Sequence, residues 1–225
     1  MKTLLVGSGH LAQHLQFYFK QKNIPFSTWK RSQDLSLFQK LASESSHILL
    51  AISDSALKPF IQENLLQAQQ KIVHFSGALN IEGAFCAHPL MSFGLDTYSL
   101  QDYEKIHFVL TSQTSLGELI PGIHNHYSVI SAKDKALYHA LCVMGGNFPI
   151  LLWQKMSEGF KDLGLPPEAS QIYLEKIVEN FNRQGQGALT GPLVRKDHGT
   201  IEANLAALSG DPFQKIYFAF VEAYQ

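Results

Sequence analysis

MKTLLVGSGHLA, residues 1–12, is the stretch that decides the fold. Residues 3–6 form a continuous apolar run, the pattern of a strand that is buried on both faces of a parallel sheet. A GxGxxA pattern follows, in which the first glycine permits a tight turn, the second lets the backbone approach a pyrophosphate, and Ala12 keeps the next helix close to the strand. A helix that begins here presents free N–H groups and the positive end of its dipole. The stretch therefore predicts a dinucleotide site at Gly7, Ser8, Gly9, His10 and Leu11.

Glycine-rich turns between a strand and a helix also occur for packing reasons alone. Here a buried-strand pattern precedes the turn, and Leu11, Leu15 and Phe19 recur behind it with helical spacing. This context favours dinucleotide binding over plain packing.

The end of the second predicted strand, residues 24–29, indicates which dinucleotide. A NAD site usually places an acidic residue about 20 residues after the turn, whereas a 2′-phosphate needs cations and hydroxyls there. This sequence offers Lys30, Arg31 and Ser32 and has no acidic residue before Asp34. Arg31 can fork onto phosphate oxygens, which favours NADP. The alternative is a solvated surface loop.

Composition excludes several classes of function. The 225 residues are 45% hydrophobic and 16% charged, enough to bury a core, and the net charge of -1 gives no case for nucleic acid or an anionic membrane. No stretch reaches about 18 apolar residues, so we expect no membrane span. Cys86 and Cys142 fit no metal motif, and we expect free thiols and a cytoplasmic location.

Alternating strand and helix patterns over the first 130 residues predict an α/β fold with a doubly wound, mostly parallel Rossmann-type sheet. Polar residues follow several strands, at the edge where such sheets bind ligands. Ile52 and Ser53 follow the third strand and should border the cofactor, while Ser76 and His88 follow the fourth and fifth. The predicted strands are residues 3–6, 24–29, 47–52, 71–75, 84–87, 107–111 and 127–131, with helices at 35–42 and 62–70 between them.

From residue 132 onward the apolar spacing is helical, so we predict an NADP-binding domain at 1–130 and an all-helical substrate and dimerisation domain at 131–225. A helix from about 134 to 161 carries a kink at Pro149, and others span about 168–181, 200–208 and 212–224. Several of these helices have apolar stripes, which favours a homodimer through the C-terminal helices.

The order of motifs resembles Rossmann-like proteins whose helical half is domain of unknown function 2520. The resemblance rests on GSGHLA at 7–12, LLAISD at 49–54, HFSGAL at 74–79, HPLMSF at 88–93, DKALYHA at 134–140 and LTGPLVRKD at 189–197. Its wider relatives are the 6-phosphogluconate-dehydrogenase-like, pyrroline-carboxylate reductase and prephenate dehydrogenase groups. The resemblance implies NADP or NAD on the sheet and helices that close the site. The short connection between the last two strands and Pro149 depart from the family pattern.

His88 is the leading candidate for catalysis. It resembles the histidine of the His-Pro motif of prephenate dehydrogenases, which hydrogen-bonds the reacting hydroxyl, and imidazole suits that role near neutral pH. Ser76 could share the same substrate oxygen. The alternatives are a histidine bonded to a loop carbonyl and a serine that caps a turn.

Three further residues complete the predicted catalytic set. The resemblance implies that Lys135 and Asn147 polarise a carbonyl and bind a carboxylate. Arg195 lies in a Gly-Pro turn and could clamp an anionic substrate in its own cleft or in that of a partner subunit. His139 shares a helical face with Lys135. The alternatives are a solvated Lys135, a half-buried His139 and a surface Arg195. His124 and His126 form a loop pair without a full ligand set, so we expect no metal.

Together these features predict an NADP-dependent oxidoreductase that transfers a hydride to or from a small, anionic carbonyl or imine. The alternative is a non-catalytic NADP(H) sensor or scaffold, which would need the turn and the basic loop but gains nothing from polar residues converging on one cleft.

Overall fold

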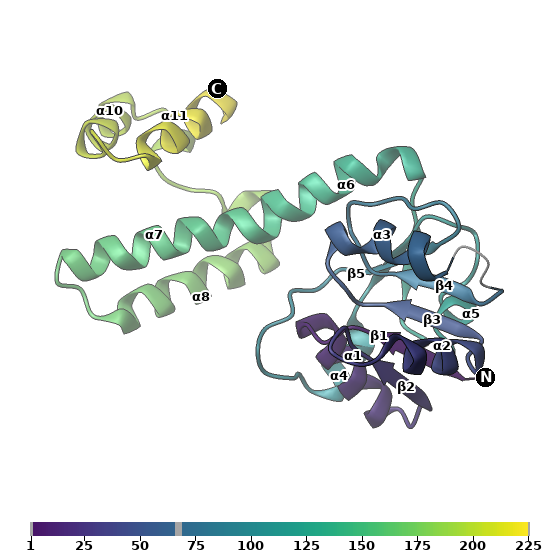
Figure 1. The fold of residues 1–225 in the computed structure, drawn as a ribbon. Coiled ribbons are helices and arrows are strands. Elements are labelled where there is room, and N and C mark those ends of the chain that lie inside the picture. Colours follow the sequence, from purple (N-terminus) through teal and green to yellow (C-terminus); the bar gives the residue numbers. More distant parts are fainter. Residues whose placement is uncertain (1, 66–68, 225) are drawn as a thin grey trace. The chain divides into compact units, whose positions relative to one another are not determined.

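In the computed structural model, which describes residues 2–65 and 69–224, the chain forms two compact units, Met1–Phe148 and Pro149–Gln225 (Figure 1). The first unit is built on a sheet of seven strands in the order β2-β1-β3-β4-β5-β6-β7. Neighbouring strands are parallel except for β5 and β6. The strands are β1 (Thr3–Val6), β2 (Phe26–Trp29), β3 (His47–Leu50), β4 (Lys71–His74), β5 (Phe85–Pro89), β6 (Phe108–Leu110) and β7 (Tyr127–Val129).

Both faces of this sheet are covered by helices, as the continuous apolar strands predict. Leu5 of β1 belongs to a core shared with α1, α4 and α5, whereas Leu4 and Val6 belong to a second core shared with α2 and α3. The chain passes from β1 to β2 on one side and to β3 on the other, which makes the carboxyl ends of β1 and β3 the switch point where such sheets bind dinucleotides. The helices are α1 (His10–Gln21), α2 (Leu35–Ser43), α3 (Asp54–Asn64), α4 (Leu100–Lys105), α5 (Leu116–Leu119) and α6 (Lys135–Cys142).

The predicted helix at 62–70 is wrong. Helix α3 begins directly after β3 and ends at Asn64, and residues 66–68 lie outside the described part of the chain. It tolerates Pro59 in its interior because Leu57 and Ile61 are buried against the sheet and hold the helix in place. Helix α4 was not predicted; Ser99 caps it, and the buried Tyr103 anchors it.

A 3-10 turn, Ala132–Asp134, leads into one continuous helical stretch. It consists of α6, a π-helical segment (Val143–Asn147) and α7 (Phe148–Asp162). The first unit thus includes α6, which the sequence analysis assigned to the helical domain. The stretch Ala132–Asp162 has the length and apolar composition that would allow a helix to cross a membrane, and its most apolar window is not buried within the chain.

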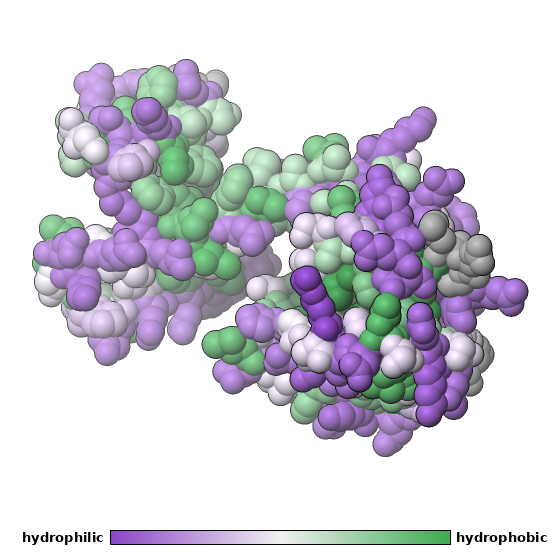
Figure 2. Space-filling view, viewed as in Figure 1, coloured by the Kyte–Doolittle hydropathy of each residue, from purple (hydrophilic) through white to green (hydrophobic). Residues whose placement is uncertain are grey.

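The second unit consists of helices with little core of their own. Gly164 ends α7 with a positive φ of 80°. The chain then forms α8 (Pro167–Gln184), a 3-10 turn (Gly185–Ala188), α9 (Pro192–Arg195), α10 (His198–Ala207) and α11 (Phe213–Tyr224). Among its described residues, the only buried apolar side chains are Ile201 and Val221. Figure 2 shows apolar side chains on the surface of this part of the molecule.

Candidate active site

A cavity of about 920 Å³ lies at the switch point, between the turn after β1 and the start of α3. Eight of the ten residues predicted to bind the cofactor line it, whereas Lys30 and Ser32 do not. The eight are Gly7, Ser8, Gly9, His10, Leu11, Arg31, Ile52 and Ser53. Six residues of α3 also line the cavity, and the sequence analysis missed them because it placed that helix too late in the chain. They are Ser55, Ala56, Pro59, Phe60, Glu63 and Asn64.

The two glycines of the turn have different tasks. Gly7 has a φ of +134°, and a Cβ there would lie 2.1 Å from the Ala51 carbonyl oxygen, so this position packs the end of β1 against the end of β3. A Cβ on Gly9 would meet no atom within 4 Å. No side chain caps the start of α1, so its first N–H groups stay available to an anion.

The second part of the site is centred on His88, at the end of β5. Its Nδ1 lies 2.7 Å from the Tyr138 hydroxyl of α6, and the two rings meet edge to face. Burial lowers the pKa of His88 to about 4, and the charges of His139 and Lys135 act in the same direction. His88 is therefore a neutral imidazole at physiological pH. Asp54 acts in the opposite direction as a weaker influence.

Gly77 brings a second imidazole to His88. A Cβ on Gly77 would lie 3.0 Å from His88 Nε2 and 2.6 Å from His139 Cδ2, so both rings rest against this glycine. His139 was noted only as a neighbour of Lys135 on a helical face. In the sequence, the signal for this pairing is Gly77 of HFSGAL, which follows the buried strand β4 beside β5.

The Ser76 hydroxyl makes its hydrogen bonds within the protein. It donates to the Asp54 carboxylate at 2.8 Å and accepts from the backbone N–H groups of Ala78 and Leu79. It therefore caps the turn after β4 and orients Asp54.

Lys135 is buried rather than solvated, with only 1% of its surface exposed. Its ammonium group donates to the Leu79 carbonyl oxygen and to Cys86 Sγ, the latter at 2.9 Å. The side chain thus fixes the start of α6 to β5 and to the turn after β4.

The remaining predicted catalytic residues lie apart from His88 or in the other unit. Asn147 is exposed at the end of the π-helical segment, twelve residues after Lys135, which corresponds to roughly 18 Å along a helix. Arg195 is exposed in α9 of the second unit. Within residues 2–65 and 69–224, no group of three or more His, Cys, Asp or Glu side chains is arranged to hold a metal ion.

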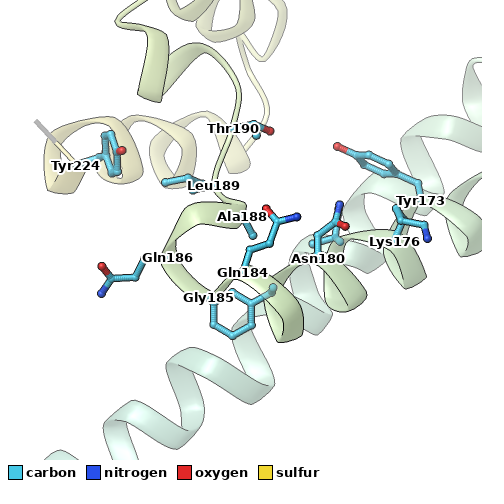
Figure 3. Close-up of a pocket in the computed structure, with 12 residues that line it drawn as sticks. Tyr173, Lys176, Asn180, Gln184, Gly185, Gln186, Ala188, Leu189, Thr190 and Tyr224 are labelled. Carbon is cyan, nitrogen blue, oxygen red and sulfur yellow. The ribbon is translucent and has the colours of Figure 1, made fainter.

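A further cavity, of about 750 Å³, lies within the second unit and was not predicted. Figure 3 shows that α8 lines it with Tyr173, Asn180 and Gln184, while Leu189 and Tyr224 approach from later in the chain. Its lining mixes amide, phenol and apolar groups.

Comparison with known families gives one match. The model of a family described as a domain of unknown function (DUF2520) matches residues 111–223, which is 113 of the 225 residues. No curated protein matches the chain.

Solved structures show the same fold over nearly the whole chain. A provisionally named NADP oxidoreductase from Bacteroides fragilis is 18% identical with a TM-score of 0.75, covering 99% of this chain and 97% of its own. A protein from Thermotoga maritima is 22% identical with a TM-score of 0.68, covering 99% and 96%. The pyrroline carboxylate reductase of Plasmodium falciparum, solved with NADP bound, is 17% identical with a TM-score of 0.59, covering 100% and 96%. These likenesses confirm the predicted Rossmann-type sheet followed by a helical region.

Proposed function

Because the chain belongs to the DUF2520 family, and because the solved structures similar to it include a reductase with NADP bound, we propose that it is an NADP-dependent oxidoreductase. Its substrate is a small, anionic carbonyl or imine. The observation that carries the proposal is that one unit holds both a dinucleotide cavity at the switch point and a neutral histidine, His88, at the carboxyl end of a nearby strand.

The residues of the cavity fit a dinucleotide. The uncapped start of α1 faces a cavity that Gly9 leaves open, which suits a pyrophosphate. Arg31 lines the same cavity after β2, where the 2′-phosphate of NADP would lie, and its fork matches phosphate oxygens. When bound, the nicotinamide supplies the hydride.

The chain's own residues act on the substrate oxygen. Negative charge develops there as the hydride reaches carbon, and a hydrogen-bond donor from His88 stabilises that charge. The buried Lys135 ammonium adds positive potential beneath the site, and Arg195 remains the candidate for holding a substrate anion. The rival function, a non-catalytic NADP(H) sensor, does not require the pairing of His88 with Tyr138.

Removing the Arg31 guanidinium should weaken NADPH binding about tenfold or more, because a charge-assisted contact to phosphate contributes roughly 1.5–3 kcal/mol. The measurement is titration of wild type and Arg31→Ala with NADPH and NADH by calorimetry. Lys58→Ala is the matched control, since Lys58 lies on α3, is exposed and does not line the cavity. Wild-type protein that binds NADH more tightly than NADPH, or neither, would contradict the cofactor assignment.

The assembly is proposed as a homodimer through the C-terminal helices. In the second unit apolar side chains that ordinarily make a core are exposed on several helices, including Ile172 and Phe181 of α8 and Phe220 of α11. A second copy of the chain presents the same faces, so pairing covers both sets at once. Pairing would also account for the exposure of the apolar window in the stretch Ala132–Asp162.

Light scattering at micromolar concentration should therefore give twice the chain mass of 25.1 kDa. Ile172→Glu, at a side chain that is 67% exposed, should shift the protein toward monomer, because a buried, unpaired carboxylate is costly. Lys215→Glu, at an exposed position of α11, is the charge-changing control. A wild-type monomer, or a protein that partitions into membranes and needs detergent for extraction, would overturn the dimer.

A further inference from the structure

We propose that Tyr138 of α6 sets the tautomer of His88: it holds the ring as a neutral imidazole with its proton on Nε2, from which His88 donates a hydrogen bond to the substrate. The role of this donor toward a substrate rests on the proposed reductase function. The assignment of the His88 tautomer does not.

The spacing of β5 and α6 brings these groups together. Cys86 and His88 are two residues apart and lie on the same face of β5. Lys135 and Tyr138 are three residues apart and lie on the same face of α6. Lys135 contacts Cys86 and Tyr138 contacts His88, so two side-chain hydrogen bonds join β5 to α6 and fix the orientation of His88.

The hydrogen bond from Tyr138 selects the tautomer. Burial, together with the neighbouring Cys142, raises the pKa of Tyr138 and keeps the phenol protonated. A phenol O–H that donates to Nδ1 leaves the imidazole proton on Nε2. This is the nitrogen that lies against Gly77. His88 thus presents a hydrogen-bond donor to the space beside that glycine.

The second imidazole beside Gly77 reinforces the neutral state of His88. The rings of both histidines rest on Gly77, so two imidazolium ions would repel each other at short range. His88 faces Lys135, Tyr138 and His139 from α6 and Asp54 from α3, and the net effect disfavours its cation.

A bound nicotinamide would supply the hydride, and negative charge would then develop on the substrate oxygen. His88 would donate a hydrogen bond from Nε2 to that oxygen and end unchanged. Solvent would supply the one proton that reduction of a carbonyl to an alcohol requires.

Nitrogen-15 NMR of the imidazole rings in the full-length protein tests this without a substrate or cofactor. Wild-type His88 should be neutral, with its proton on Nε2, from pH 5 to 8. In Tyr138→Phe, His88 should show a mixture of the two neutral tautomers. In His139→Asn, His88 should keep its proton on Nε2. His124, in an exposed loop, should give the same signals in all three proteins.

A proton on Nδ1 of wild-type His88, an imidazolium at pH 6, or an unchanged tautomer in Tyr138→Phe overturns the proposal. The wild-type spectrum decides the first two points even if the variant fails to fold. Failure of the reductase function would appear separately, as absence of NADPH binding in the calorimetric titration.

Discussion

Replacement of His88 by asparagine should lower turnover by about a hundredfold or more while NADPH affinity stays within about twofold of wild type. The reason is that the Nε2 donor acts on charge that exists only as the hydride arrives, so its loss is felt in the transition state. Asparagine keeps a polar side chain toward Tyr138, whose hydroxyl lies 2.7 Å from Nδ1, but it has no group in the position of Nε2.

The measurement needs a substrate, found by screening 2-oxo acids, 3-oxo acids and cyclic imines for oxidation of NADPH. His124→Asn is the matched control, because this histidine is exposed in the loop before β7 and should have no effect on turnover. If His88→Asn keeps wild-type turnover, the donor role is wrong. If the wild-type protein binds NADPH but reduces nothing in the screen, the sensor interpretation gains weight.

The dinucleotide half of the fold could be predicted because its signals are local. Gly7, Gly9 and Ala12 lie within six residues, and β1 and β3, whose ends form the switch point, are buried along their whole length. The position of α3 was missed because Pro59 obscures its helical pattern, and only burial of Leu57 and Ile61 against the sheet keeps this helix intact. The six residues by which this helix lines the cavity were therefore missed as well.

The arrangement around His88 depends on contacts between distant segments, which a sequence does not display. Lys135 was open to a solvated or a substrate-binding interpretation, and the structure shows a third state in which a buried ammonium anchors α6 to β5. His139 meets His88 only because Gly77, about 60 residues earlier in the chain, leaves room for both rings. Such a pairing follows from packing of α6 on the sheet and not from spacing within either segment.

The two glycines of the first turn allow a test that separates folding from binding. Gly7→Ala should lower the free energy of unfolding by about 3 kcal/mol or more, which for a chain of this size lowers Tm by roughly 6–12 °C. The new Cβ would lie 2.1 Å from the Ala51 carbonyl oxygen, in a residue with a φ of +134°. The ends of β1 and β3 cannot easily move apart to relieve this clash, because the Ala51 N–H donates to the Val6 carbonyl at 2.8 Å and holds them together.

Gly9→Ala is the matched variant, with the opposite outcome. Gly9 has a φ of -72°, and a Cβ there meets no atom within 4 Å, so thermal unfolding should occur at the wild-type temperature or slightly above it. The methyl group would instead occupy space in which the pyrophosphate approaches the backbone, and NADPH affinity should fall by tenfold or more. Differential scanning calorimetry with and without NADPH measures both effects. Equal loss of stability in the two variants would contradict the division of tasks between the glycines, and unchanged NADPH affinity in Gly9→Ala would place the pyrophosphate elsewhere.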